Sequence, residues 1–278
     1  MTSSNPPSTI DRLLAAASEI DACSEEEAAR FFNKVIEGMG RRHISLSWGD
    51  RLLTIDKSCG FIEDPGFREA LRSIRGSHQY DQYNGADSIA WRLNTLCWAA
   101  RRGLSVGGDF VECGVFKGDM AWVVSQALGP TRIPSFYLFD SFDGFSPTHS
   151  DATDFPDNPG FLDFANRFYK QQGLFEYVRD RFAPYPNIRV IKGFLPEMFE
   201  TTCPERVGFL HVDLNSPRAE IGVLDKLFDK ILPGGAIVFD DYGWKLFWKQ
   251  KQAADAFMRA RSHEILELPS GQGLVIRL

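Results

Sequence analysis

The sequence predicts a doubly wound α/β fold, in which helices cover both faces of a mostly parallel sheet. Strand and helix patterns alternate from residue 109 onward, and this alternation is typical of right-handed βαβ units. A turn containing glycine joins the first of these strands to its helix, and four turn residues at 270–273 separate two short strand patterns near the C-terminus. These observations favour one α/β domain that ends in a hairpin.

Composition places the chain among ordinary globular proteins. Of its 278 residues, 44% are hydrophobic and 24% are charged, and the formal net charge is -6. A negative chain without clustered cations does not suit a phosphate backbone, so we expect no nucleic-acid partner. No apolar run approaches the roughly 20 residues of a membrane span, and the polar start MTSSNPPST does not resemble a signal peptide. We expect a cytoplasmic protein with no membrane partner.

The cysteine pattern indicates reduced thiols. Five cysteines are scattered at positions 23, 59, 97, 113 and 203, with no CxxC pair and no zinc spacing. Cys113 lies beside the first strand-to-helix turn. A small packed residue is favoured there over a nucleophile, because no histidine lies near Cys113 in the sequence.

The first hundred residues predict an extension before the α/β domain. Residues 1–9 are rich in Ser and Pro and are expected to be disordered, whereas 10–104 are expected to form a mainly helical cap before a domain at 105–278. This cap is expected to cover a ligand site, to contact a second copy in a homodimer, or both.

Two helices are predicted within this extension. Ser24 and the three acids after it make a capped start for a helix that ends at Gly38 or Gly40. A second helix is predicted from Gly85 to Arg102, ending before Gly103. Residues 41–83 carry mixed signals and support no detailed prediction.

The domain follows as alternating elements. Strands are predicted at 109–113, 135–139, 188–191, 207–212 and 236–239, and helices at 119–128, 161–182, 196–200, 219–231 and 245–261. The helix at 219–231 is expected to close at Pro233-Gly234-Gly235. The segment 142–161 is rich in Pro, Asp, Ser and aromatic residues, and a loop of that length is either disordered or a functional lid.

The turn DFVECGVFKGD at 109–119 is the sharpest functional motif. Gly114 permits a tight turn and the approach of a ligand, Gly118 lets the next helix sit close, and Glu112 can accept from an ammonium or hydroxyl group. The spacing is not the dinucleotide pattern, and an acid beside the turn suits a cationic ligand such as S-adenosylmethionine. Predicted cofactor contacts are Glu112, Cys113, Gly114, Val115, Phe116 and Gly118. A tight turn without a ligand is the alternative.

Two further strand ends complete the predicted cofactor site. Asp140 ends the second strand, where an acid can bind both hydroxyls of a ribose, and Ser141 follows it. Asp140 as a plain turn cap is the alternative. Gly193 and Phe194, after the strand at 188–191, are expected to lie beside the adenine, although Phe194 as ordinary core is equally favoured.

Carboxylates at two neighbouring strand ends predict a metal site. Asp213 ends one buried strand, and Asp240 and Asp241 end the next. Three such carboxylates repel one another unless a cation or a proton compensates them, and Mg²⁺ suits this donor set. Asp213 is also placed to take the proton of a substrate hydroxyl. The alternative is that Asp240 and Asp241 only cap loops. His211 is expected either to pack in the core or to support the metal ligands.

Taken together, these motifs resemble the macrocin O-methyltransferase (TylF-like) family. The resemblance covers about residues 80–278 and rests on FVECGVFKG, FDSFDGF, IKGFLPEMF, LHVD and LPGGAIVFDDYG, in that order. It implies a class I methyltransferase fold, with seven strands of which the last is antiparallel. It also implies S-adenosylmethionine at Glu112, Gly114, Gly118 and Asp140, Mg²⁺ at Asp213, Asp240 and Asp241, and Asp213 as the base.

The chain departs from the family pattern after Asp213. Macrolide sugar enzymes have D-G-D-x-Y there, whereas this chain has Asp213-Leu214-Asn215-Ser216. A missing second acid would weaken a metal site and bears on the deoxysugar substrate. We expect an O-methyltransferase of a hydroxylated small molecule, such as a sugar or natural product. A non-catalytic protein that binds S-adenosylmethionine or its product is the alternative, and an oxidoreductase is disfavoured by the absent dinucleotide pattern.

Overall fold

In the computed structural model, the described residues are 46–49, 52–55, 57–74 and 88–278, with single helical positions at 27, 30, 33, 34, 37 and 38. Those positions agree with the helix predicted after Ser24. The segment at 1–9 lies outside the described residues. The chain divides into two compact units, residues 1–47 with 53–58 and residues 48–52 with 59–278. The second unit carries the sheet and the candidate site.

Short elements occupy the region for which the sequence supported no prediction. β1 (Leu46–Gly49) and β2 (Leu52–Ile55) pair into a small sheet, so the extension is not helical throughout. Helices α3 (Gly60–Glu63) and α4 (Pro65–Arg72) follow. Asp64 caps α4 by accepting from the Phe67 N–H at 2.7 Å, which satisfies one of the open donors of the first turn.

Residues 88–278 contain the predicted seven-stranded sheet, in the order β5-β4-β3-β6-β7-β9-β8. Its strands are β3 (Asp109–Cys113), β4 (Phe136–Asp140), β5 (Ile188–Lys192), β6 (Val207–Val212), β7 (Ile231–Phe239), β8 (Leu266–Glu267) and β9 (Gly273–Ile276). The first five are parallel, and β9 runs antiparallel to both β7 and β8. The doubly wound fold and the C-terminal hairpin are therefore confirmed.

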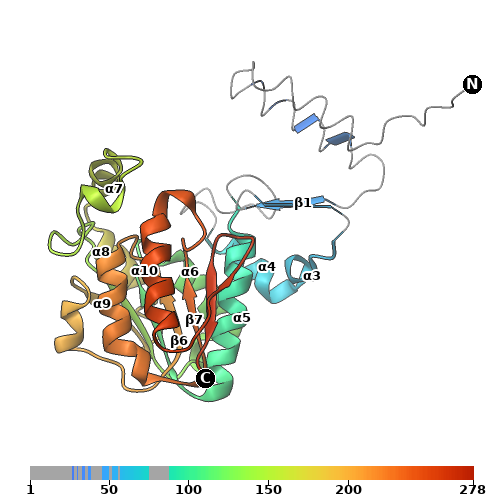
Figure 1. Ribbon diagram of the computed structural model, residues 1–278. Coiled ribbons are helices and arrows are strands. Elements are labelled where there is room, and N and C mark those ends of the chain that lie inside the picture. The colour runs from blue at the N-terminus through green and yellow to red at the C-terminus, as the bar shows by residue number, and fades with distance from the viewer. Residues whose placement is uncertain are drawn as a thin grey trace, which may run out of the picture. The chain divides into compact units, whose positions relative to one another are not determined.

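Helices cover both faces of this sheet (Figure 1). One face packs against α5 (Ala90–Val106), α6 (Asp119–Leu128) and α8 (Leu174–Phe182). The other packs against α9 (Pro217–Leu227) and α10 (Trp248–Arg259). Side chains alternate along each strand: Phe110 joins the first core and Val111 the second. None of the described helices is both long enough and apolar enough to span a membrane.

Helix α5 extends past its predicted end and belongs to the sheet layer. Gly103 was expected to stop the helix, but a Cβ there would lie 2.8 Å from the Phe209 Cβ. Gly103 therefore allows α5 to lie close to β6. The helix ends instead at Gly107, whose φ of 76° is the left-handed conformation that glycine favours. Because α5 packs on the sheet, the compact unit begins earlier than the boundary expected at residue 105.

Two other predicted boundaries differ from the structure. The helix predicted at 161–182 is interrupted, because α7 (Phe161–Tyr169) ends before Gly173, whose φ of 76° precedes α8. Helix α9 ends at Leu227, and β7 already starts at Ile231. Pro233-Gly234-Gly235 is thus a bulge within β7 rather than the turn before it, since Val207 pairs with Ile231 and Phe209 with Ala236.

The segment at 142–161, expected to be a disordered or lid-like loop, packs against its neighbours. It contains a short 3-10 helix, η3 (Ala152–Asp154), and Phe155 is buried. The His149 carbonyl accepts from the Ser216 hydroxyl at 2.6 Å, and Asp151 pairs with Arg218 at 2.6 Å. These contacts hold the segment against the start of α9.

Candidate functional site

A cavity of about 730 Å³, partly open to solvent, lies at the carboxyl ends of the parallel strands. Open α/β sheets bind ligands in this position. Its wall combines residues from the strand ends with residues from the 142–161 segment and the helices beside it. The lining residues are Gly114, Phe116, Asp140, Ser141, Gly144, Phe145, Ser146, Ser150, Tyr169, Leu174, Gly193, Phe194, Leu195, Asp213, Leu214, Asn215, Ser216 and Ala219.

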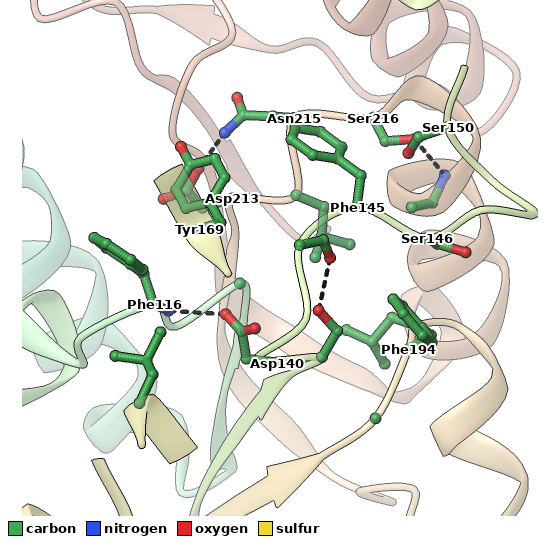
Figure 2. Close-up of a pocket in the computed structure, with 18 residues that line it drawn as sticks. Phe116, Asp140, Phe145, Ser146, Ser150, Tyr169, Phe194, Asp213, Asn215 and Ser216 are labelled. Atoms are coloured by element: carbon green, nitrogen blue, oxygen red, sulfur yellow. Dashed lines mark hydrogen bonds between the residues drawn. The ribbon is translucent and has the colours of Figure 1, made fainter. Parts of the chain in front are cut away.

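Asp140 organises one end of this cavity (Figure 2). Its Oδ2 accepts from the N–H groups of Val115 and Phe116 at 2.7 and 2.8 Å, and its Oδ1 accepts from the Phe142 N–H at 2.6 Å. The turn-cap role considered from the sequence is therefore present. Each carboxylate oxygen has two lone pairs, so Asp140 retains capacity to accept from a ligand hydroxyl.

Gly114 lies where the ends of β3 and β6 meet. It has a φ of 91°, and a Cβ on it would lie 1.9 Å from the Asp213 carbonyl oxygen. The close approach predicted for this glycine is thus an approach to protein backbone, and it keeps the backbone of the turn next to Asp213. Gly193, on the far side of Asp140, has a φ of 158° and has no room for a Cβ beside the Met198 sulfur.

Several predicted site residues lie behind the wall of the cavity. Among the described residues, those predicted as ligands that do not line it are Glu112, Cys113, Val115, Gly118, Asp240 and Asp241. Cys113 is buried in the core, as expected for a packing residue. A Cβ at Gly118 would lie 2.9 Å from the Phe182 ring, so Gly118 allows α8 to approach, whereas the sequence assigned this close packing to the next helix, α6.

Asp213 lines the cavity and lies beside Asn215. The Asn215 Nδ2 donates to the Asp213 Oδ1 at 3.3 Å. Burial, together with the charges of Asp240 and Asp241, raises the pKa of Asp213 well above its usual value. Glu220, at the start of α9, is a second buried carboxyl group nearby, and burial followed by the charge of Asp213 raises its pKa as well. Negative charge around Asp213 is therefore undercompensated.

Asp240 faces α5 and is surrounded by donors. Its Oδ2 is ion-paired with the Arg92 Nη1, and its Oδ1 accepts from the Gln272 Nε2 at 2.9 Å. Burial alone would raise the pKa of Asp240, but Arg92 and His211 outweigh it and hold that pKa far below its usual range. The Asp241 Oδ1 lies 3.4 Å from the same Arg92 Nη1.

His211 is buried between two carboxyl groups. Its Nε2 lies 3.4 Å from the Asp240 Oδ1 and its Nδ1 lies 3.7 Å from the Glu112 Oε2, distances of ion pairs rather than close hydrogen bonds. Burial would lower the pKa of His211, but Asp240 and Glu112 raise it to about 10. The raised pKa favours the imidazolium form of His211, whose charge would balance these carboxyl groups. One of its ring nitrogens also lies within 4.8 Å of carboxylate oxygens of Asp213 and Asp240, and it could join them around a cation only after losing its proton.

The structure adds residues that the sequence did not identify. Phe145 and Tyr169 form an aromatic wall with ring centroids 6.0 Å apart, and Tyr169 contacts Phe116 at 5.2 Å. Ser150 and Asn215 bring polar side chains to the same cavity. Asn215 belongs to the segment after Asp213 in which the sequence departs from the family pattern. No sequence motif marked Ser150 or the two aromatic residues as site residues.

The residues present fit both groups that the fold implies. For S-adenosylmethionine, the cavity has the carboxylate of Asp140 at one end. Its wall also contains backbone at Gly114 and Gly193, where there is no room for a Cβ. For a divalent cation, Asp213, Asp240 and Asp241 offer carboxylate oxygens at the ends of two neighbouring strands, and hard oxygen donors suit Mg²⁺. Arg92 and Gln272 occupy one lone pair on each oxygen of Asp240 and leave others.

Comparison with known proteins identifies relatives over the same region. The sequence profile "Macrocin-O-methyltransferase (TylF)" matches residues 91–267, which is more than half of the chain. The chain is 30% identical over 159 residues to mycinamicin III 3''-O-methyltransferase of Micromonospora griseorubida. It is also 27% identical over 164 residues to 8-demethyl-8-(2,3-dimethoxy-alpha-L-rhamnosyl)-tetracenomycin-C 4'-O-methyltransferase of Streptomyces olivaceus. Each match covers 54% of this chain. The matched part is 62% of the mycinamicin enzyme and 60% of the tetracenomycin enzyme.

Solved structures share the fold. The O-methyltransferase NovP superposes with a TM-score of 0.60 at 18% identity, covering 76% of this chain and 97% of NovP. The calicheamicin methyltransferase CalS11 superposes with a TM-score of 0.57 at 15% identity, covering 79% and 93% of the two chains. With the sheet order and the strand-end cavity, the profile match establishes that this chain belongs to the macrocin O-methyltransferase (TylF) family.

Proposed function

We propose that the protein is an S-adenosylmethionine-dependent O-methyltransferase that methylates a hydroxyl group on a sugar of a small natural product. The observation that carries this proposal is the placement of Asp140 and Asp213 in one cavity, next to the turn at Gly114 (Figure 2). The two relatives of known name, both O-methyltransferases of such compounds, support the acceptor class.

The cofactor would occupy the end of the cavity around Asp140. An acid at the end of the second strand can bind ribose hydroxyls, and Asp140 keeps one lone pair, on Oδ1, for such a hydroxyl. Gly114 and Gly193 bring backbone close to the ligand, while Phe194 presents a ring for the adenine. Glu112 lies behind this wall against His211, so we propose an indirect role for it through the strand end.

Asp213 would take the proton of the acceptor hydroxyl. Its raised pKa, caused first by burial and then by Asp240 and Asp241, makes it a stronger base than an exposed carboxylate. The cavity would hold the two substrates in line beside Asp213, and such positioning is worth roughly 7–11 kcal/mol in well-oriented reactions. When bound, S-adenosylmethionine would supply the methyl group, and Asp213 would keep the proton taken from the acceptor hydroxyl.

A divalent ion would be held by Asp213, Asp240 and Asp241. When bound, Mg²⁺ would lower the pKa of the acceptor hydroxyl and balance the carboxylates. Arg92 and the protonated His211 already compensate part of the charge of Asp240. We therefore expect Asp213 and Asp241 to supply most of the affinity for the ion.

Methyl transfer from labelled S-adenosylmethionine to 4-nitrophenyl α-L-rhamnoside, with Mg²⁺ or with EDTA, tests this function. We expect turnover that falls on addition of EDTA, and an Asp213→Asn protein that loses about 10²–10⁴ of kcat, the usual contribution of a general base. Full turnover by Asp213→Asn would remove Asp213 from this role. A protein that binds S-adenosylhomocysteine but methylates no hydroxylated acceptor would support a binding function without catalysis.

A further inference from the structure

Asn215 has a buried oxygen without a partner inside the cavity. Only 7% of the residue is exposed, and its Oδ1 makes no hydrogen bond among the described residues. The amide nitrogen donates to Asp213, so the carbonyl end faces away from that carboxylate (Figure 2). A buried carbonyl that lacks a donor costs about 1–3 kcal/mol, so a ligand that supplies a donor would recover this energy.

The backbone of Asn215 is held in an unusual conformation. Its φ is 53°, in the left-handed region that few residues other than glycine adopt. Asparagine is among the non-glycine residues that adopt this region most readily, so the conformation directs the amide at little cost. The unpartnered oxygen of an amide held in this direction on the cavity wall indicates that its position serves a ligand.

Ser150 presents a second polar group without a partner. It is 7% exposed, and its Oγ makes no hydrogen bond among the described side chains. Ser150 also lines an adjoining cavity of about 850 Å³, together with Phe145 and Phe194. In Figure 2, Asn215 and Ser150 lie toward the top of the view and Asp140 toward the bottom. The unpartnered groups are therefore separated from the end assigned to the cofactor.

We propose that Asn215 and Ser150 form a polar subsite that hydrogen-bonds hydroxyl groups of the acceptor other than the one that is methylated. The proposal rests on the function proposed above and names what the site recognises: a polyhydroxylated ring. The Asn215 Oδ1 can only accept, so it selects a hydroxyl that donates. The Ser150 Oγ can donate or accept. The rings of Phe145 and Tyr169 pack edge to face, with centroids 6.0 Å apart, and supply an apolar wall beside which such a ring would lie.

Asn215 also couples this recognition to Asp213. Its amide nitrogen lies 3.3 Å from the Asp213 Oδ1, so one rigid amide contacts the base and the second hydroxyl at once. An acceptor that satisfies Asn215 would thereby be oriented with respect to Asp213. Asn215 is thus a specificity-determining residue, and the base remains Asp213.

Binding of acceptor analogues tests the proposal. The probes are 4-nitrophenyl α-L-rhamnoside and its three monodeoxy analogues, titrated calorimetrically into protein saturated with S-adenosylhomocysteine, and turnover is measured in parallel. A site built to hydrogen-bond a hydroxyl rejects the analogue that lacks it, so we expect at least one analogue to bind wild type about tenfold more weakly than the parent. In Asn215→Gly, that difference should fall to about twofold or less.

The variants are chosen so that folding does not obscure the result. Glycine tolerates the φ of 53°, and Asn215→Asp keeps an oxygen acceptor and should keep the discrimination. Ser150→Ala should lose discrimination at a different hydroxyl. Ser146→Ala is the control, because Ser146 lines the same cavity but its Oγ already bonds Thr148 at 2.9 Å. It should behave as wild type.

The outcomes separate the two proposals. If Asn215→Gly discriminates among the analogues as wild type does, or if wild type accepts all analogues equally while still methylating the parent, the subsite is wrong and the O-methyltransferase function stands. If no glycoside binds or is methylated although S-adenosylhomocysteine binds, the sugar acceptor class itself fails, and the subsite fails with it.

Discussion

The Arg92 guanidinium on α5 is ion-paired with the Asp240 carboxylate at the end of β7, although 148 positions separate the two residues in the chain. Both side chains are buried. With Gln272 from the turn between β8 and β9 and His211 from β6, Arg92 fixes the strand end beside Asp213. The helix packed on the sheet therefore supplies the cation that the strand-end carboxylates need.

Removal of this cation should destabilise the fold. Replacing Arg92 by Met leaves Asp240 buried without its main counter-charge, and breaking a buried pair in this way costs about 3–5 kcal/mol. The free energy of unfolding in urea measures the loss. Arg101→Met, at an exposed position on the same helix, is the control and should change stability by about 0.5 kcal/mol or less. Equal losses in the two variants would show that the pair contributes no specific stability.

The sequence predicted those parts of the site that local chain geometry determines. Asp140, Asp213 and Gly114 follow strand ends, and parallel strands bring such ends to one edge of a sheet. The position of Glu112 was not foreseen, because the strand's alternation turns it toward α5, beside His211 on the neighbouring strand. The sequence did contain a sign of this orientation, because the apolar neighbours Val111 and Cys113 face the opposite core. Arg92 had no local signal, since its partner is defined only by the packing of α5.

The end of α5 likewise could not be predicted from local sequence alone. Gly103 and Gly107 are both glycines near the end of α5, and local propensity favours the earlier one as a stop. The structure uses Gly103 for contact with Phe209 and Gly107 for the left-handed cap. Only the position of β6 distinguishes the two glycines, and a single sequence does not contain that position.

Gly114 should tolerate no side chain. Gly114→Ala combines an unfavourable φ of 91° with a Cβ only 1.9 Å from the Asp213 carbonyl oxygen, so the ends of β3 and β6 must move apart. Gly107→Ala is the matched control, because its φ is 76° but nothing lies within 4 Å of the added Cβ. We expect about 1 kcal/mol of destabilisation at Gly107 from the backbone alone, and a larger loss at Gly114 with loss of S-adenosylhomocysteine binding. Thermal unfolding with and without that ligand measures both, and similar effects at the two positions would contradict the close approach.

The buried thiols should be inert in the native protein. Burial raises the pKa of Cys97 to about 12 and that of Cys113 well above its usual value. A raised pKa keeps the thiol protonated at pH 8, and the thiolate is the reactive form. Iodoacetamide at pH 8 followed by mass spectrometry should therefore modify these two cysteines only after denaturation. Rapid native labelling of Cys97 would contradict its burial on α5 in the core, whereas the partly exposed Cys59 and Cys203 serve as internal references.

The 142–161 segment should open more readily when its ion pairs are removed. Arg218 contacts Asp151 at 2.6 Å in a half-exposed pair and lies 3.7 Å from Asp154, which is buried. Exposed pairs contribute little to global stability, so Arg218→Gln should leave the melting temperature nearly unchanged while increasing amide hydrogen exchange in this segment. Lys226→Gln, which removes an exposed pair with Glu200 elsewhere, is the control. Unchanged exchange in Arg218→Gln would show that Arg218 does not hold the segment.

The central claim is that the strand-end cavity binds the methyl-donor cofactor beside a metal-assisted base. Thermal melting with S-adenosylhomocysteine, in Mg²⁺ and in EDTA, tests it most directly, because a ligand that binds only the folded protein raises the melting temperature. We predict a rise with S-adenosylhomocysteine that is larger in Mg²⁺ and is lost in Asp140→Ala. A rise that is the same in Mg²⁺ and EDTA would remove the metal from the account, and no rise in folded wild-type protein would contradict the cofactor site itself.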